Sequence, residues 1–371
     1  MKLLKVIADG FKNCEDGFEI SMVPLARKTS EDKEYELEEI ADGLYTYATL
    51  GIVGKNASGK TSALELLSIS HEILWFFRVN KKTYSVNNVS LTLFFFHDGN
   101  IYKYKTLLKE DIISDKIIFE NQEIQYKKYF KSKVNEIFED IEFVKYENEG
   151  ALPEDTSNIF FVIKKIIPSC MYFSSFDTGH SVYNDIFTAK KAFGISDEVL
   201  MKIIRIFDEN ITQLKMLDDN NYQLKYSGKT EKLSAKQLYY RLSSGTTKGM
   251  NLYTYIIISL KNGIDIIIDE IENHFHKTLV ENIISLYKDK SVNKKNASLI
   301  FATHYCEILD LFNRQDNIYI TKADKKVHIQ NMYRDYDVRP ELLKSKQFYN
   351  DTFNTAVNYE FLMDLKKELK K

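Results

Sequence analysis

The fold follows from residues 48–61, which read Ala-Thr-Leu-Gly-Ile-Val-Gly-Lys-Asn-Ala-Ser-Gly-Lys-Thr. An apolar, β-branched run stops at Gly54, and an apolar helical segment follows Thr61. Together these residues satisfy the pattern G-x-x-x-x-G-K-[ST] in the strand–loop–helix setting that the pattern requires. A chance glycine-rich turn is the alternative, and the flanking strand and helix disfavour it.

The chemistry of this loop explains its spacing. Gly54 and Gly59 let the backbone turn so that its N–H groups surround a phosphate. Lys60 adds a positive charge for the β- and γ-phosphates, and the Thr61 hydroxyl suits Mg²⁺. The following helix aims its positive dipole end at the same anion. The candidate nucleotide-binding residues are Gly54, Lys55, Asn56, Ala57, Ser58, Gly59, Lys60, Thr61 and Ser62.

Length and composition bound the fold class. The chain has 371 residues, 44% hydrophobic and 28% charged, which is enough for one large or two modest domains. Tyr and Phe occur 24 times each and Pro only 4 times, so low-complexity disorder is not expected. The formal net charge of −2 gives no global positive field, so nucleic acid would need a local basic surface.

Cysteine usage and hydropathy predict a compartment. Cys14, Cys170 and Cys306 show no C-x-x-C spacing, which favours a reducing compartment and disfavours a structural zinc site. The N-terminus lacks the apolar core of a signal peptide, and no window approaches 18 uninterrupted apolar residues. We expect a soluble, cytoplasmic protein without membrane contact.

The first third of the chain predicts strands around the phosphate loop. Residues 3–8 and 18–23 read as paired strands, and the helix after Lys60 extends to about Val79. A turn at Asp98-Gly99 joins two further strands, 89–96 and 101–108, into a hairpin. With short strands at 117–119 and 124–126, these predict an antiparallel layer.

The chain is predicted to be a single domain, 1–371, in three parts. Residues 1–126 form an N-terminal lobe, 127–234 a mostly helical insertion, and 235–371 a C-terminal lobe with a closing helix. Within the insertion, 127–140 and 197–210 read as helices, the second beginning at a Ser196 N-cap. Neither sustains heptads, so no coiled-coil arm is expected.

Gly263-Ile-Asp-Ile-Ile-Ile-Asp-Glu270 is an apolar run that ends in two carboxylates. Such a run is typical of a strand buried on both faces of a parallel sheet. At its carboxyl end Asp269 would bind the Mg²⁺ shell and Glu270 would polarise the attacking water. The alternative is a core strand that ends in ordinary solvated acids.

Residues 298–304 form another buried-strand pattern, which ends in Thr-His. One helical segment, 279–288, separates it from the Asp-Glu strand, so the βαβ rule places the two strands side by side. We therefore expect His304 to contact the γ-phosphate, although a lone histidine at a strand end is usually structural.

Two weaker motifs flank the Asp-Glu strand. Ser243, Ser244 and Gly245 precede an apolar helix and offer hydroxyl and N–H groups to an anion. Taken alone, a plain helix cap explains them better, but their position just upstream of the Asp-Glu strand favours an anion site. His274 and His276 lie two residues apart near carboxylates. They would face opposite sides of a strand, so a subunit contact or an active-site loop is a better interpretation than a shared metal.

This ordered set resembles the ABC-type ATPase heads of the RecF/SMC and OLD-like group, and most closely the abortive-infection type AAA ATPases of bacterial antiphage systems. Gly10-Phe-Lys-Asn13 is similar to their opening N-F-R-S/K stretch. Asp269-Glu-Ile-Glu-Asn-His-Phe-His276 looks like their D-E-P-E-x-H-L-H run. Thr303-His-Tyr-Cys-Glu-Ile-Leu-Asp310 looks like T-H-S-P-E-I-L-D. The resemblance covers about residues 1–108 and 235–320.

The resemblance implies an ABC-head fold, with a mixed central sheet, an antiparallel β layer and a helical insertion. It also implies a homodimer or higher oligomer with two ATP molecules at the interface. Ser243 and Gly245 of one subunit would face the γ-phosphate held by Lys60 and Thr61 of the other. Glu270 would be the catalytic base and His304 the γ-phosphate sensor, and Lys12 would add a phosphate or nucleotide contact.

The chain departs from the family pattern at three places, of which the first two distinguish it from transporter subunits and the third leaves the Q-loop unassigned. Thr246 replaces the Gln or Glu that is usual in transporter and SMC proteins, Ile271 replaces a common Pro, and Gln122 and Gln125 are only weak candidates for the Q-loop. About 65 residues follow His304, fewer than a TOPRIM nuclease needs. A nuclease or toxin effector is therefore expected to be a separate protein.

The leading hypothesis is an Mg²⁺-dependent ATPase switch that controls such an effector in antiphage defence. The alternative is a DNA repair or recombination ATPase of the RecF/SMC kind. It would need a basic surface, for which the candidates are Lys127, Lys128, Lys131, Lys133, Lys164 and Lys165, or these lysines form an ordinary solvated face. A transporter subunit is disfavoured by the insertion before Leu242 and by Thr246.

Overall fold

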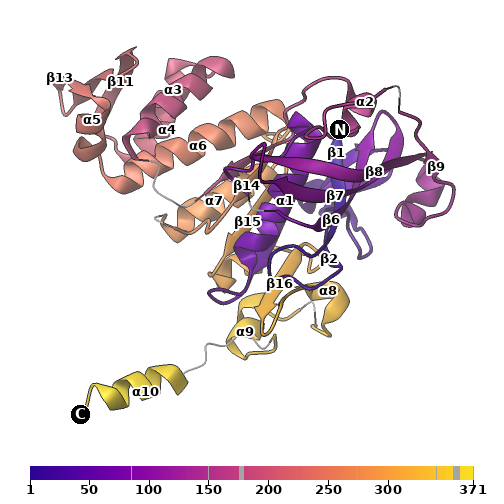
Figure 1. The fold of residues 1–371 in the computed structure, drawn as a ribbon. Helices are drawn as coiled ribbons and strands as arrows, with labels where there is room; N and C mark the ends of the chain where they lie inside the picture. Colours follow the sequence, from indigo (N-terminus) through magenta and orange to yellow (C-terminus); the bar gives the residue numbers. More distant parts are fainter. Residues whose placement is uncertain are drawn as a thin grey trace. The chain divides into compact units, whose positions relative to one another are not determined.

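The computed structural model describes residues 1–84, 86–148, 150–174, 179–273, 275–339, 341–353 and 360–370. They form two compact units, drawn in Figure 1. Unit 1 comprises Met1–Ile166 and Ala302–Lys371, and unit 2 comprises Ile167–Phe301. These units differ from the three predicted parts because the C-terminal strands return to the phosphate-loop strand, which divides the predicted C-terminal lobe.

The elements of unit 1 are, in chain order, β1 Lys2–Asp9, β2 Phe18–Ser21, η1 Asp32–Glu36, β3 Leu37–Ala41, β4 Leu44–Tyr47, β5 Thr49–Val53, α1 Lys60–Phe76, β6 Val89–His97, β7 Asn100–Asp111, β8 Lys116–Lys128, η2 Lys131–Glu136, β9 Val144–Lys145, α2 Ile159–Ile163, η4 Cys306–Leu311, β16 Ile318–Ala323, β17 Val327–Asn331, α8 Met332–Asp335, α9 Lys344–Tyr349 and α10 Glu360–Glu368.

The elements of unit 2 are β10 Cys170–Phe173, η3 Gly179–Ser181, α3 Val182–Ala192, α4 Asp197–Phe207, β11 Ile211–Asp218, β12 Asn221–Tyr226, β13 Lys229–Ser234, α5 Ala235–Arg241, α6 Ser244–Asn262, β14 Asp265–Ile268 and α7 Lys277–Lys288. The last strand, β15 Leu299–Thr303, crosses the boundary between the units.

The predicted antiparallel layer is confirmed in unit 1. Its strands follow the order β2-β1-β6-β7-β8-β9, and the long β6–β8 meander is visible in Figure 1. The turn between β6 and β7 has positive φ at both Asp98 (45°) and Gly99 (76°), the geometry that matches the twist of paired strands. The two short strands predicted at 117–119 and 124–126 are parts of one strand, β8.

Unit 1 also contains the phosphate-loop strand. β5 pairs in parallel with β16, and β16 pairs antiparallel with β17. α1 contacts both β1 and β5, so it lies against the antiparallel layer and the P-loop strand. The predicted α/β class with a mixed sheet is confirmed. β16 has a hydrogen-bonded neighbour on each side, β5 and β17.

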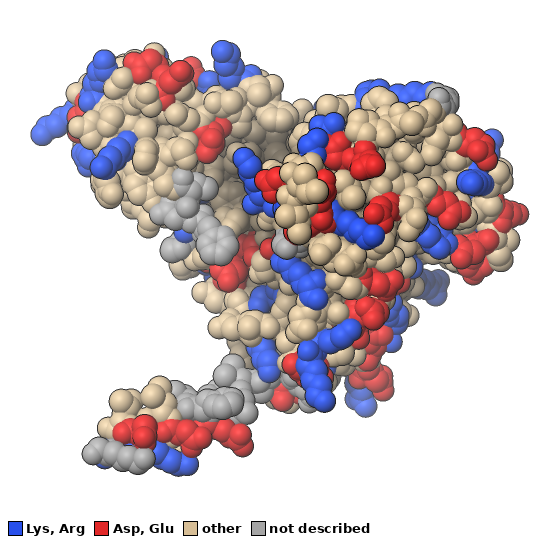
Figure 2. Space-filling view, viewed as in Figure 1, with Lys and Arg blue, Asp and Glu red and all other residues tan. Residues whose placement is uncertain are grey.

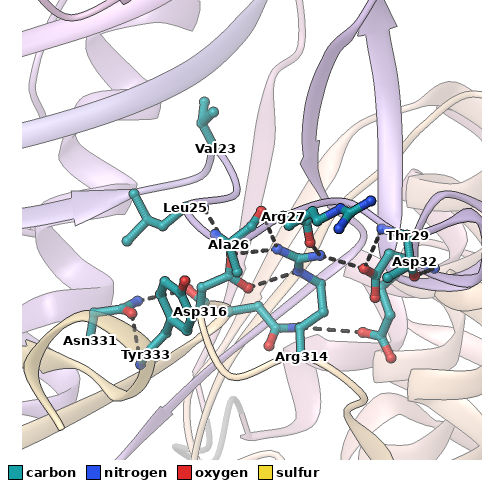
Figure 3. Close-up of polar contacts among 12 residues, drawn as sticks. Val23, Leu25, Ala26, Arg27, Thr29, Asp32, Arg314, Asp316, Asn331 and Tyr333 are labelled. Carbon is teal, nitrogen blue, oxygen red and sulfur yellow. Dashed lines mark hydrogen bonds and ion pairs between the residues drawn. The ribbon is translucent and has the colours of Figure 1, made fainter. Parts of the chain in front are cut away.

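A buried ionic cluster joins the loop after β2 to the segment before β16 (Figure 3). Arg314 donates to both oxygens of Asp316, at 2.8 and 2.6 Å, and to Asp32 Oδ2 at 2.7 Å. It also donates to the carbonyl oxygens of Ala26 and Arg27. A buried charge costs stability unless it is paired and hydrogen-bonded, and Arg314 meets both conditions.

Unit 2 holds the strand that ends in Asp-Glu. β14 pairs in parallel with β10 and with β15, and α7 connects β14 to β15. The prediction that residues 298–304 lie on the strand next to β14 is therefore confirmed. All four residues of β14 are buried, as the continuous apolar run requires.

The predicted mostly helical insertion differs from the structure at both ends. Residues 127–140 contain the end of β8 and the short helix η2 instead of a long helix. Near the other end, β11, β12 and β13 form an antiparallel sheet whose apolar face packs on α3, α4 and α5. Alternate burial of Tyr222 and Leu224 in β12 is the period-two signal that was missed. α4 begins at the predicted Ser196 cap.

The helices α9 and α10 lie near the C-terminal end of the chain. The closing helix predicted at 349–371 corresponds to α9, which ends at Tyr349, and to α10, while residues 354–359 and 371 lie outside the described residues. Within the ranges described above, no helix has both the length and the apolar character needed to cross a membrane.

Candidate nucleotide-binding site

The phosphate loop begins where β5 ends. Its two glycines are required by close contacts. A Cβ atom at Gly54 would lie 2.5 Å from Thr321 Oγ1, and one at Gly59 would lie 2.2 Å from Val327 Cγ1. Gly59 also has a φ of 99°, which side chains disfavour. The loop is therefore seated directly on β16 and β17, and the Ser58 hydroxyl strengthens this contact with a 2.7 Å hydrogen bond to Thr321 Oγ1.

Lys60 places a buried positive charge inside this loop. Its Nζ donates to the carbonyl oxygens of Gly54 at 3.0 Å and Lys55 at 3.1 Å. The same Nζ lies 3.3 Å from His304 Nδ1, so the structure brings together two residues that are 244 positions apart in sequence. An anion bound by Lys60 would therefore lie within reach of His304.

The helix behind the loop starts at Lys60, one residue before the predicted start, and Gly59 is its N-cap. Its backbone begins with the bond from Ala63 N–H to Gly59 O, so the N–H groups of the first turn remain directed toward an incoming anion. Thr61 is exposed and Ser62 half-buried on that turn. The helix ends at Phe76, earlier than the predicted Val79, because Phe77 adopts the left-handed conformation.

Lys12 has a partner on the same helix. Its ammonium forms an ion pair with Glu65 of α1. Burial lowers the pKa of Lys12, and the nearby Cys14 opposes that shift. The predicted nucleotide contact of Lys12 stays a prediction, and any such contact would compete with Glu65.

The two acids after β14 differ in their surroundings. Asp269 is buried, and its backbone N–H donates to Phe173 O at 3.0 Å. Glu270 is half-buried and has a φ of 49°, an uncommon conformation for a residue with a side chain. Asn273 donates to the Glu270 carboxylate at 3.4 Å. Backbone outliers of this kind concentrate at functional sites, which favours a functional role for Glu270.

The Ser-Ser-Gly motif lies at the start of α6. Ser243 is the N-cap, and its Oγ accepts from Thr246 N–H at 3.0 Å. Ser243 and Ser244 are exposed, while Thr247 is buried and hydrogen-bonds the Tyr183 hydroxyl at 2.9 Å. The motif therefore makes a helix cap and leaves both serine side chains accessible.

A cavity of unit 2 joins these two motifs. Ser244, Lys248 and Asn251 line it from α6, and Asp269 and Glu270 line it from the end of β14. Sequence reasoning missed Lys248 and Asn251. Their spacing from Ser244, four and seven residues along one helix face, could have identified them.

The two histidines after Glu270 were considered above as possible metal ligands. His276 is the N-cap of α7, and its Nδ1 accepts from Thr278 N–H at 3.4 Å. His274 lies outside the described residues. In the part of the chain that the structure describes, no three His, Cys, Asp or Glu side chains are grouped as a metal site. Thr61 and Asp269, the predicted Mg²⁺ ligands, each carry an oxygen donor of the kind that Mg²⁺ prefers.

Three of the six lysines considered for DNA binding have local acceptors. Lys127 Nζ donates to the carbonyl oxygens of Glu136, Glu139 and Ile141. Lys131 pairs with Asp42 and Lys133 with Glu142. Figure 2 shows acidic and basic side chains interspersed over the face of unit 1 that it displays. This arrangement is typical of a solvated surface rather than of a phosphate-binding patch.

Comparisons with known proteins give one family and several distant folds. A family model described as "AAA domain, putative AbiEii toxin, Type IV TA system" matches residues 50–310. None of the curated proteins compared with this sequence matches it. Among solved structures, an SMC head domain from Thermotoga maritima is 12% identical with a TM-score of 0.42. An SmcHead bound to the C-winged helix domain of ScpA is 13% identical with a TM-score of 0.45. Each alignment covers 91% of this chain and 100% of the other.

Proposed function

The chain belongs to the AAA domain family whose model spans its residues 50–310, and from that premise we propose that it is an ATP-binding and hydrolysing switch. The observation that carries the proposal is the phosphate loop itself. A buried Lys60 ammonium lies in a glycine-framed loop at a helix N-terminus, 3.3 Å from His304. This combination of N–H groups, dipole and cation selects a polyphosphate.

The residues of the phosphate loop and those that follow β14 have different proposed roles in ATP hydrolysis. Residues 54–62 would bind the phosphates. Thr61 and Asp269 would supply oxygen ligands to Mg²⁺, which would offset the negative charge of the triphosphate. Glu270 orients and deprotonates the attacking water, and His304 contacts the γ-phosphate. Lys60 exchanges its carbonyl partners for phosphate oxygens when ATP enters.

The proposed switch is a dimer of two such chains. Ser243, Ser244 and Gly245 of one subunit would face the γ-phosphate bound to the other. Their exposure at the start of α6 supports this role, because a second subunit can reach them. ATP then favours the closed dimer through contacts that the open form lacks, and hydrolysis reverses the shift.

We further propose that the state of this dimer controls a separate toxin or nuclease effector in bacterial antiphage defence. The family description, which mentions a toxin of a toxin–antitoxin system, supports a role of this class. A DNA repair role has less support, because three of the six candidate lysines, Lys127, Lys131 and Lys133, have local acceptors.

Two substitutions test the ATPase proposal. Lys60→Ala should abolish ATP binding. Glu270→Gln should still bind ATP with Mg²⁺, hydrolyse it about 10²–10⁴-fold more slowly because the general base is lost, and accumulate as a dimer. Phosphate release and light scattering after gel filtration measure these effects.

The matched control is Glu281→Gln, which removes a half-buried carboxylate of α7 that pairs with Lys277. It should hydrolyse ATP at the rate of the unmodified protein. Wild-type hydrolysis by Glu270→Gln would show that the base is wrongly assigned. ATP binding by Lys60→Ala at full affinity would contradict the whole proposal.

A further inference from the structure

A second cavity lies beside the phosphate loop in unit 1. Its volume is about 300 Å³, and it is lined by Glu15, Lys55, Thr321, Lys322, Ala323, Asp324, His328 and Gln330. That volume is at the lower end of small-molecule sites, which run from roughly 300 to 1,000 Å³. The residues come from three separate stretches of chain, so the cavity is a built feature of the fold.

Two of these residues connect the cavity to the phosphate loop. Lys55 is a loop residue whose carbonyl oxygen accepts from Lys60 Nζ at 3.1 Å. Thr321 hydrogen-bonds the loop residue Ser58 at 2.7 Å. A ligand whose phosphates are bound by the loop can therefore extend into this cavity.

The lining of the cavity includes an ionic triad. His328 Nδ1 lies 2.6 Å from Glu15 Oε2, and its Nε2 lies 3.1 Å from Asp324 Oδ1. The backbone fixes this part of the lining, because Glu15 N–H donates to Val327 O and Val327 N–H donates to Asn13 O. Gln330 is also oriented, since its Oε1 accepts from the Tyr336 hydroxyl at 2.6 Å.

The cavity offers hydrogen-bond acceptors beside the phosphate loop. Glu15 and Asp324 contribute carboxylates and Lys55 and Lys322 contribute ammonium groups to its lining, while the phosphates of a nucleotide would stay with Lys60 and the loop N–H groups. A carboxylate has about four acceptor positions, so each keeps capacity beyond its bond to His328. The ligand groups that suit these carboxylates are neutral and carry hydrogen-bond donors, as the ribose hydroxyls do.

We propose that this cavity binds the nucleoside part of the nucleoside triphosphate, with Glu15 accepting a hydrogen bond from a ribose hydroxyl. The inference rests on the proposed ATP-binding function. It adds a nucleoside site formed by Glu15, Asp324 and Gln330 and a preference for ribose over deoxyribose.

The test compares three ligands by calorimetry: ATP, 2′-deoxy-ATP and inorganic tripolyphosphate. The unmodified protein should bind ATP about tenfold or more tightly than tripolyphosphate, and several-fold more tightly than deoxy-ATP. Glu15→Gln should lose most of both preferences while its affinity for tripolyphosphate stays unchanged. Asp16→Asn removes an exposed carboxylate outside the cavity and should behave like the unmodified protein.

The outcomes separate the two proposals. Equal affinity of the unmodified protein for ATP and tripolyphosphate would overturn the nucleoside site and leave the phosphate loop intact. If Glu15→Gln weakened the binding of ATP and of tripolyphosphate by the same factor, the nucleoside site would also be overturned. If Glu15→Gln does not fold, Asp324→Asn repeats the comparison. Failure to bind either ligand would refute the ATP-binding function and this inference with it.

Discussion

His328 is the residue whose charge is best defined by its neighbours. Its hydrogen bond to Glu15 raises the pKa above the ordinary histidine value, burial opposes the shift, and Asp324 adds to it. Lys55 and Lys322 also line the same cavity. Since the folded pKa is the higher one, the stabilisation is complete below the unfolded pKa of about 6.5 and is lost as pH rises through the folded pKa.

The predicted consequence is a loss of thermal stability as pH rises above 6.5 that depends on His328. His328→Gln should be less stable than the unmodified protein at pH 6 and should show a flatter profile over this range. Thermal unfolding at matched ionic strength measures the difference. Parallel profiles for the two proteins would contradict the ionic assignment of the triad.

Cys14 gives a second residue-scale prediction. Burial raises the pKa of its thiol to about 11, although Lys12 lowers it. Because the thiolate is the reactive form, Cys14 should be alkylated much more slowly than the half-buried Cys306 at pH 8. Mass spectrometry of the iodoacetamide-treated native protein measures the order. Faster labelling of Cys14 than of Cys306 would show that the segment around Cys14 is accessible to solvent in the native protein.

Local patterns predicted some residues of the site and could not predict others. The phosphate loop is contiguous in sequence, so its pattern is local. The strand pattern before His304 predicted a γ-phosphate contact, and His304 lies beside Lys60 in the structure. The Lys12–Glu65 and Glu15–His328 pairs join residues 53 and 313 positions apart. No local period encodes such contacts, so only the folded chain shows them.

At the level of elements, the start of α6 has an observed role as a helix cap and a proposed role at a second subunit's phosphate, and a substitution can separate them. Ser243→Asp keeps a good N-cap, so the stability of the helix should stay within about 0.5 kcal/mol of the original. The added negative charge would repel a γ-phosphate presented by a second subunit. We expect normal ATP binding by the monomer and loss of dimer-dependent hydrolysis.

The control for that experiment is Ser243→Ala, which removes the cap and should cost about 1 kcal/mol of stability. Unfolding curves and phosphate release together distinguish the two roles. Full hydrolysis by Ser243→Asp would assign the motif to capping alone.

Elements with strong local signals were predicted correctly, and elements stabilised by tertiary contacts were not. The Asp98-Gly99 turn fixed the β6–β7 hairpin, and Ser196 marked the start of α4. The strands β11–β13 alternate buried and exposed positions only weakly, because their buried face packs on helices distant in sequence. Residues 127–140 have helical composition, yet β8 continues to Lys128 since β7 pairs with its whole length.

At the scale of the whole molecule, Arg314 connects distant parts of unit 1. Arg314→Leu should destabilise the protein by about 3–5 kcal/mol, because it leaves the buried Asp316 and Asp32 without their partner. Arg334→Leu is the matched control. That arginine is nearly half exposed and pairs with Glu19 and Asp335, so its loss should cost under about 1 kcal/mol.

Urea unfolding followed by circular dichroism measures both variants against the unmodified protein. A loss for Arg314→Leu no larger than that for Arg334→Leu would show that the buried cluster contributes little. Both substitutions replace an arginine by leucine, so the two variants differ mainly in how deeply the arginine side chain was buried.

The seat of the phosphate loop has a consequence for biosynthesis. Gly54, Ser58 and Gly59 rest on Thr321 and Val327, and the Ser58–Thr321 bond spans 263 positions. A ribosome adds about 5–20 residues per second, so the loop emerges many seconds before the strands that support it. The nascent chain therefore cannot complete its anion pocket until translation has passed residue 331, and stalled or shortened products should not retain nucleotide.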